Sequence, residues 1–133
     1  MKMVKEELDA KLEAHVKWLK TRFTCNVEGA RADLTDADLT DADLTRAKLT
    51  DAKLTGAKLT CADLTRADLT RADLTRAHLT YADLTGVDLT GADLTDADLN
   101  IWRASPFVYE ALAASFAAQM ALKKTRIEWR QNH

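Results

Sequence analysis

The sequence predicts an all-β repeat solenoid with a helix at each end. From Ala32 to Ile101 the chain divides without insertion into fourteen five-residue units. The apolar fraction is 47% but only 6% of the residues are aromatic, so the core must be built from small repeated aliphatic groups. The segments on either side lack this repeat and instead carry apolar residues at three- and four-residue steps, as amphipathic helices do.

Every unit follows the same pattern. Position three is Leu in all fourteen units, position one is Ala except for Val87, and position four is Thr except for Asn100. A period of five fits neither a helix nor an alternating strand, but it does fit a short strand followed by a corner. Positions one and three then point inward, and positions two, four and five point outward. All three glycines of the repeat stand at position five, where a corner needs backbone freedom.

The predicted core is the row of leucines at position three, with the small alanines at position one allowing the corners to close. These structural residues are Leu34, Leu39, Leu44, Leu49, Leu54, Leu59, Leu64, Leu69, Leu74, Leu79, Leu84, Leu89, Leu94 and Leu99.

This pattern, which opens as Ala32-Asp33-Leu34-Thr35-Asp36, resembles the pentapeptide-repeat family and its motif A-(D/N)-L-X-X. The resemblance covers 70 of the 133 residues. It implies a right-handed quadrilateral β-helix with four pentads in each coil, and therefore about 3.5 coils. At a strand spacing of ~4.8 Å the stack would be about 17 Å long.

Four pentads per coil would stack residues that are twenty positions apart. Opposite charges then meet between coils on three faces, as cross-strand pairing favours. The remaining face stacks like charges, which Arg46 and Arg66 would offset. The predicted columns are Asp33/Lys53/Asp73, Asp38/Lys58/His78/Asp98, Lys48/Asp68, Asp51/Arg71 and the like-charged Asp43/Asp63/Asp83.

The N-terminal segment, residues 1–25, is predicted to be a capping helix, and residues 26–104 the β-helix. The helix should cover roughly residues 3–23, because apolar side chains recur there on one face. Asn26 to Gly29 reads as its exit turn. The apolar face consists of Val4, Leu8, Leu12, Val16, Leu19 and Phe23.

The C-terminal segment, residues 105–133, is predicted to be a second helix. Ser105-Pro106 provides an N-cap followed by a proline at the first helical position, and the helix should end near Trp129. It either folds along its own stack or pairs with another copy. We expect a homodimer, as the resemblance implies. The candidate interface is Val108, Leu112, Phe116, Met120 and Ile127.

No catalytic, cofactor-binding or metal-binding residues are predicted, and the chain is expected not to be an enzyme. His15, His78 and His133 are far apart in the pattern, and Cys61 has no neighbouring base. No apolar run approaches the roughly 18 residues of a membrane span, and no signal peptide opens the chain. We therefore expect a cytoplasmic protein, or a recombinant synthetic product, with no cofactor, nucleic-acid or membrane partner.

Two functions remain open. Residues 32–101 carry a net charge of −7 between basic ends of +2 and +3, which would suit an acidic partner-binding module of the DNA-mimicking, gyrase-binding type known in the family. The unusual regularity of Thr favours instead an engineered consensus scaffold with no evolved ligand. Ice binding is disfavoured because Asp or Lys stands beside each Thr. The corner column Asp41, Cys61, Tyr81 and Ile101 is interpreted as a docking path for the C-terminal helix.

Overall fold

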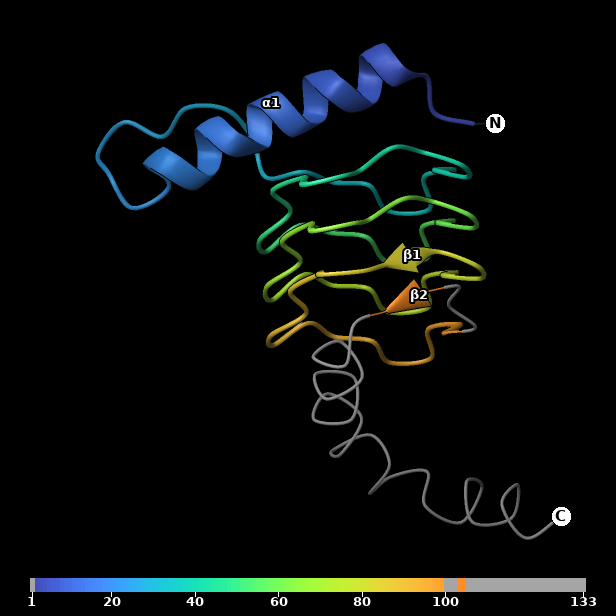
Figure 1. Ribbon diagram of the computed structural model, residues 1–133. Coiled ribbons are helices and arrows are strands. Elements are labelled where there is room, and N and C mark those ends of the chain that lie inside the picture. Colours follow the sequence, from blue (N-terminus) through green and yellow to red (C-terminus); the bar gives the residue numbers. More distant parts are fainter. Residues whose placement is uncertain (1, 100–102, 105–133) are drawn as a thin grey trace, which may run out of the picture.

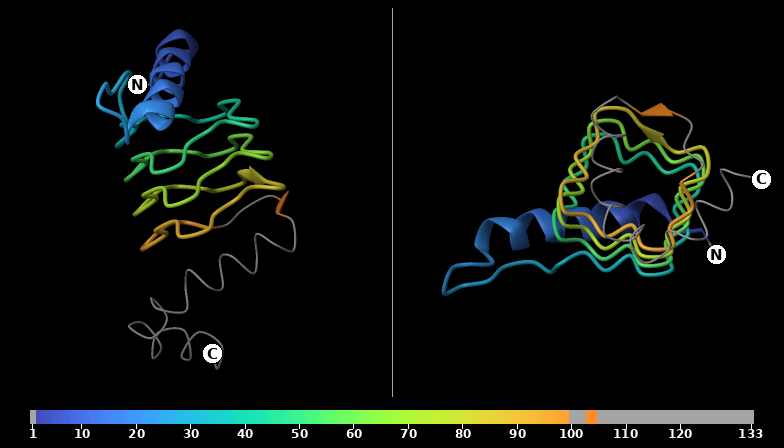
Figure 2. Two further views of the ribbon diagram at one scale, coloured as in Figure 1. Left: turned by 90° about the vertical axis from the view of Figure 1, so that its left-hand side faces the viewer. Right: turned by 90° about the horizontal axis from the view of Figure 1, so that it is seen from below.

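The computed structural model describes residues 2–99 and 103–104. The helix α1 spans Lys5–Thr21 and is followed by a stack of coils that contains the short strands β1, Asp83–Leu84, and β2, Arg103–Ala104. Figure 1 shows the coils lying one below another, with α1 across the first of them. Seen along the stack in Figure 2, successive coils superimpose on a four-sided outline.

The coils pair through parallel bridges that join residues twenty positions apart. The bridges run from Asp33↔Lys53 to His78↔Asp98, and β1 pairs with β2 in the same register, with Asp83 opposite Arg103. Each side of a coil is straight for only two or three residues, so most pairings are single bridges rather than strands. The predicted twenty-residue period is therefore confirmed.

The stack encloses a row of leucines. The thirteen position-three leucines from Leu34 to Leu94 are 0–1% exposed, and Leu99 is partly buried against them. Position-one alanines are buried in the inner coils, whereas Ala37, Ala42 and Ala47 in the first coil are only partly buried. The inward orientation predicted for positions one and three is what the structure shows.

Nearly every backbone N–H of a unit finds a carbonyl. Around Leu64, position two donates to the preceding coil (Asp63 N–H to Ala42, 2.9 Å) and position three donates to the following coil (Leu64 N–H to Asp83, 2.9 Å). Position five also donates to the following coil, as Arg66 does to Thr85 at 2.8 Å. Position one closes the corner, as Ala67 N–H does on the Leu64 carbonyl at 2.9 Å. Only the N–H of position four lacks a backbone partner in this pattern.

The corners share one unusual backbone conformation. Position five has a positive φ of 56–69° in every described unit, which is the pattern of a type II turn and favours glycine. Gly56, Gly86 and Gly91 fit it without strain. Ten residues with side chains adopt it as well: Asp36, Asp41, Arg46, Asp51, Cys61, Arg66, Arg71, Arg76, Tyr81 and Asp96. Thus the backbone freedom predicted from three glycines is required at all of the described corners.

Helix α1 lies within the range 3–23 expected from the sequence, but its predicted apolar face is only partly correct. Leu8 is buried and Leu12 partly buried against the coil, whereas Val4 is 58% and Phe23 88% exposed. For Phe23 the reason is the size of the coil: the C-terminal end of α1 extends beyond the outline of the stack, so side chains there have no coil to cover (Figure 2). The predicted C-terminal helix, its interface from Val108 to Ile127, and Ile101 lie outside the described residues.

Because Arg46 has φ +59°, Arg46→Gly should raise the free energy of unfolding by about 1 kcal/mol, since an L-residue in the left-handed region costs roughly 1–2 kcal/mol. The matched control is Thr45→Gly, whose φ is not positive and which should lower stability. Urea unfolding followed by circular dichroism measures both. Equal destabilisation by the two glycines would contradict the assigned corner.

Candidate functional site

The outward face of each unit is organised by a hydrogen bond from Thr to Asp. Wherever position two is Asp in the described units up to residue 95, its Oδ1 accepts the N–H of the Thr two residues later, at 2.9–3.1 Å. In six of these units the Thr hydroxyl also donates to the same oxygen, at 2.5–2.7 Å. This bond satisfies the N–H that the backbone leaves over, so the Asp-x-Thr spacing has a structural purpose.

These hydrogen bonds also set the ionisation of the acidic face. Bonds from the Thr hydroxyl, and then from the Thr amide, stabilise the charged carboxylates and lower their pKa values below 3.8. For Asp73, burial opposes this effect without reversing it. The six carboxyl groups with a lowered pKa of this origin are Asp33, Asp38, Asp43, Asp63, Asp73 and Asp88. The face therefore stays negatively charged at neutral pH.

The predicted charge columns have the right register, but most do not form ion pairs. Among residues 2–99 and 103–104, ion pairs join Lys2 to Asp41, Arg22 to Asp51 and Arg71 to Asp51. The expected contacts of Lys53 with its acidic neighbours above and below are absent, because each carboxylate is held by its own Thr. Of the predicted columns, the ion pair between Asp51 and Arg71 is confirmed.

Lysine or histidine at position two changes the local bonding. Lys48, Lys53 and Lys58 have no acceptor for the Thr amide. His78 stacks between Lys58 and Asp98 as predicted, and the hydroxyl of Thr80 turns to Asp98 Oδ2 of the next coil, at 2.6 Å. In this unit a side-chain hydrogen bond between coils replaces the local one.

His15 joins α1 to the first coil. Its Nδ1 accepts the N–H of Ala32 at 2.9 Å, and its Nε2 donates to the carbonyl of Thr50 at 2.9 Å. These two bonds require the neutral ring with its proton on Nε2. The side chain is fully buried, and this burial lowers the pKa of the imidazole, with Arg22 and Arg31 acting in the same direction and the Thr50 bond opposing them.

Sequence reasoning missed this role, although a signal was present. His15 follows Leu8 and Leu12 at steps of four and three, so it lies on the buried face of the helix. A polar residue at such a position needs a hydrogen-bond partner, which here is the open end of the coil.

Other groups near α1 bind carbonyls of the first coil that have no preceding coil to pair with. Met3 N–H donates to Asp38 at 2.9 Å, where Lys2 extends the stack by one parallel bridge. Lys11 Nζ donates to the Asp33 carbonyl at 3.2 Å. With His15, these groups supply three donors to an edge that would otherwise be exposed.

Asp51 is the charged centre of the same junction. Arg71 of the next coil binds it in a bidentate manner, at 3.0 and 3.1 Å, and Arg22 at the end of α1 donates to Oδ2, one of the two oxygens that Arg71 also binds. These bonds, that from Arg71 foremost, lower the pKa of Asp51 to about 2. The guanidinium of Arg22 also lies 5.0 Å from the ring centre of Trp18 and 4.7 Å from that of Phe23.

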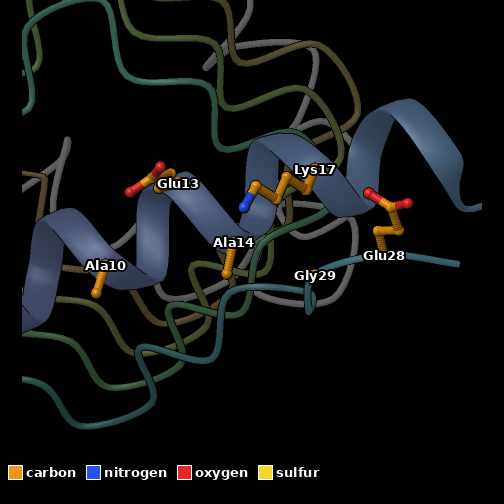
Figure 3. A pocket seen from close by; sticks show the side chains of 6 residues that line it. All are labelled: Ala10, Glu13, Ala14, Lys17, Glu28 and Gly29. Carbon is orange, nitrogen blue, oxygen red and sulfur yellow. The ribbon is translucent and has the colours of Figure 1, made fainter.

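Two surface cavities lie along α1. One, of about 450 Å³, is a hollow bounded by Ala10, Glu13, Ala14, Lys17, Glu28 and Gly29 (Figure 3). There Gly29, with φ +75°, lets the incoming chain approach closely enough for Ala30 N–H to bind the Ala14 carbonyl at 3.2 Å. The other, of about 280 Å³, lies between the start of α1 and Leu39–Asp43. Neither cavity is lined by a cysteine or a histidine.

The remaining reactive groups are dispersed. Cys25 and Cys61 are exposed free thiols. Within residues 2–99 and 103–104 no three His, Cys, Asp or Glu side chains gather as metal ligands. In the same part of the chain, no helix has the length and apolar character needed to cross a membrane.

The parallel register, the leucine row and the repeated corner define a β-helical repeat protein. The family model described as pentapeptide repeats (8 copies) matches the chain over residues 32–71 and again over residues 67–100. The chain thus belongs to the pentapeptide-repeat family, and the resemblance noted from the sequence is confirmed. The family's known structures are right-handed quadrilateral β-helices.

Solved structures of the family resemble the chain over part of its length. A pentapeptide-repeat protein from the thylakoid lumen of Arabidopsis thaliana is 30% identical with a TM-score of 0.51, the match covering 56% of this chain and 57% of that one. HetL of Nostoc sp. strain PCC 7120, which is involved in regulating heterocyst differentiation, is 44% identical with a TM-score of 0.30, over 50% of this chain and 36% of that one. No curated protein matches the chain.

Asp88→Ala should lower the free energy of unfolding by about 1–2 kcal/mol, because the Thr90 amide and hydroxyl would lose their acceptor. Asp88→Asn is the matched variant: it retains a carbonyl oxygen and should cost less. Thermal unfolding measures both. An Asp88→Ala variant as stable as the parent protein would contradict the structural role given to the Asp–Thr hydrogen bonds.

Proposed function

We propose that the chain is a non-catalytic repeat scaffold, a stack of about 3.5 right-handed coils whose end is covered by α1. The observation that carries the proposal is the use of the carboxylates. The Asp side chains that could have served chemistry are bound instead to the amides of their own units. Family membership also indicates a non-enzymatic repeat protein.

We further infer that the sequence is an engineered consensus without an evolved ligand. Its support is regularity: Leu fills position three in fourteen of fourteen units and Thr fills position four in thirteen. Among the described residues, every position-three Leu up to Leu94 is buried, and every position-two Asp up to residue 95 binds the amide of its own Thr. The expected cytoplasmic location stays a prediction.

The role that we propose for α1 is that of an N-terminal cap. A β-helix ends in an open parallel edge, which pairs readily with other chains. Here the carbonyls of Asp33, Asp38 and Thr50 on that edge already have donors from the segment that contains α1. Leu8 and Leu12 meanwhile cover part of the apolar end.

The C-terminal segment should make the scaffold a homodimer through Val108, Leu112, Phe116, Met120 and Ile127. Light scattering after size exclusion should give twice the chain mass of 14.8 kDa. Leu112→Glu with Phe116→Glu should give the monomer mass, because charges would enter the apolar contact. Ala114→Glu, placed away from that face, is the control and should remain dimeric. A monomer in the parent protein would exclude this interface.

An acidic partner-binding module is the second candidate, favoured by the exposed column that begins with Asp43 and Asp63. Neither carboxylate has an ion-pair partner among the described residues, and the pKa of each is lowered by Thr. This column could face a basic groove, as in the gyrase-binding members of the family. Net charge in the repeat is −7.

Salt dependence distinguishes the two candidates, with bacterial DNA gyrase as the probe. The scaffold should show no binding by surface plasmon resonance at either 50 or 300 mM salt, between which the Debye length falls from about 14 Å to about 6 Å. A DNA mimic should bind at the lower concentration and lose affinity steeply at the higher one. Asp43→Asn with Asp63→Asn would abolish such binding, and this result would replace the scaffold proposal by the acidic module.

A further inference from the structure

We propose that α1 is an acid-releasable cap and that His15 is the proton-sensitive latch holding it. The proposal rests on the capping role given to α1 above. His15 lies at the centre of the contact and holds the start of the first coil at Ala32 and a carbonyl in the coil's last unit at Thr50. One imidazole therefore fastens α1 to both ends of the same coil.

The bonding pattern permits only one protonation state. Nδ1 is an acceptor for the Ala32 amide, so it carries no proton while α1 is docked. Protonation would place an N–H at Nδ1 directly opposite another N–H, replacing an attraction by a repulsion. The Thr50 bond would survive, but the Ala32 amide would lose its partner in a buried position. A buried donor without an acceptor is costly, so the ring must leave its site.

The charges around His15 add to this sensitivity. Those that face it are Arg22 at the C-cap of α1, Arg31 in the segment entering the coil, and Asp51 at the coil's corner. Asp51 could stabilise an imidazolium, but its carboxylate is already bound by Arg22 and Arg71. A protonated ring would therefore meet two guanidinium groups. Stacking on Trp18, whose ring centre is 5.4 Å away, acts in the opposite direction, because an aromatic face attracts a cation, but it supplies no acceptor for the Ala32 amide.

The direction of the pH effect follows from linkage. The pKa of His15 in the folded protein is below 6.5, so the released state binds more protons than the docked state. Docking is thus fully stable above pH 6.5 and weakens as the pH falls below it. The Asp–Thr bonds of the coils involve carboxyl groups with pKa values below 3.8, so they remain intact in this window. The cap should be released while the stack persists.

Release would change the surface of the molecule. The first coil would expose the Thr50 carbonyl and the Ala32 amide together with the apolar end that Leu8 covers. Such an edge is open to pairing with another chain. A fall in pH would therefore expose the N-terminal edge of the stack for pairing with another chain.

The test is amide hydrogen exchange of the full chain between pH 7.5 and 4.5, corrected for intrinsic exchange. Protection of the α1 amides should fall by up to about tenfold per pH unit below 6.5, because one proton is linked to release. Amides of the inner coils, such as Leu64 and Leu69, should keep their protection. His15→Gln, which cannot titrate, should remove the pH dependence of α1. His78→Gln changes an exposed histidine on a coil face and should behave as the parent protein does.

A second measurement keeps the proposal testable if His15→Gln does not fold. The nitrogen-15 shifts of His15 in the parent protein should show an unprotonated Nδ1 at pH 7.5, and its protonation should share one midpoint with the loss of α1 protection. Constant α1 protection down to pH 4.5, a loss that persists in His15→Gln, or simultaneous loss in the inner coils would each overturn the latch. Unprotected α1 amides already at pH 7.5 would overturn the cap itself.

Discussion

Backbone pairing between residues twenty positions apart is the constraint on which the rest of this structure depends. Within each unit three N–H groups donate to neighbouring coils, as Asp63, Leu64 and Arg66 illustrate. Such pairing exists only if each coil returns to the same place after four corners. That condition requires identical corners, which explains why a positive φ recurs at position five even where Arg or Asp must adopt it. The inter-coil pairing therefore requires the same backbone geometry in every unit, and the repeated sequence provides it.

The side chains complete what the backbone pairing leaves open. Leucine at position three fills the interior, and alanine at position one lets the chain turn without colliding with that leucine. Aspartate at position two binds the only amide that neither a corner nor a neighbouring coil has satisfied. The acidic surface is therefore first a consequence of backbone satisfaction, and any binding function of that surface would use charge already present for structural reasons.

The ends of the stack pose a different problem, because a translational repeat cannot satisfy its own last edge. At the N-terminus the solution combines a one-bridge extension at Lys2, the Lys11 ammonium and the His15 imidazole, each meeting a carbonyl of the first coil. Asp51 then ties the end of α1 to the second coil through Arg22 and Arg71. These contacts are specific to individual residues, in contrast to the repeated contacts of the coils. Whatever regulates the end of the stack must act on them.

The sequence by itself determined the repeat, its inward leucines and alanines, and the existence of α1. The first two follow from the five-residue period with its invariant Leu, and α1 follows from apolar residues at three- and four-residue steps. The twenty-residue register was expected from the resemblance to the family, because a period of five does not fix the number of sides of a coil. Tertiary structure decided which partners the polar groups take. The Asp carboxylates were expected to pair with Lys53 or Lys58 across the coils. They bind instead the amide of the Thr two residues later, because the short Asp side chain reaches that nearby backbone amide more easily than a side chain on the next coil. His15 became the link between α1 and the coil because Ala32 and Thr50, distant in sequence, meet there, and no periodic pattern records such a meeting.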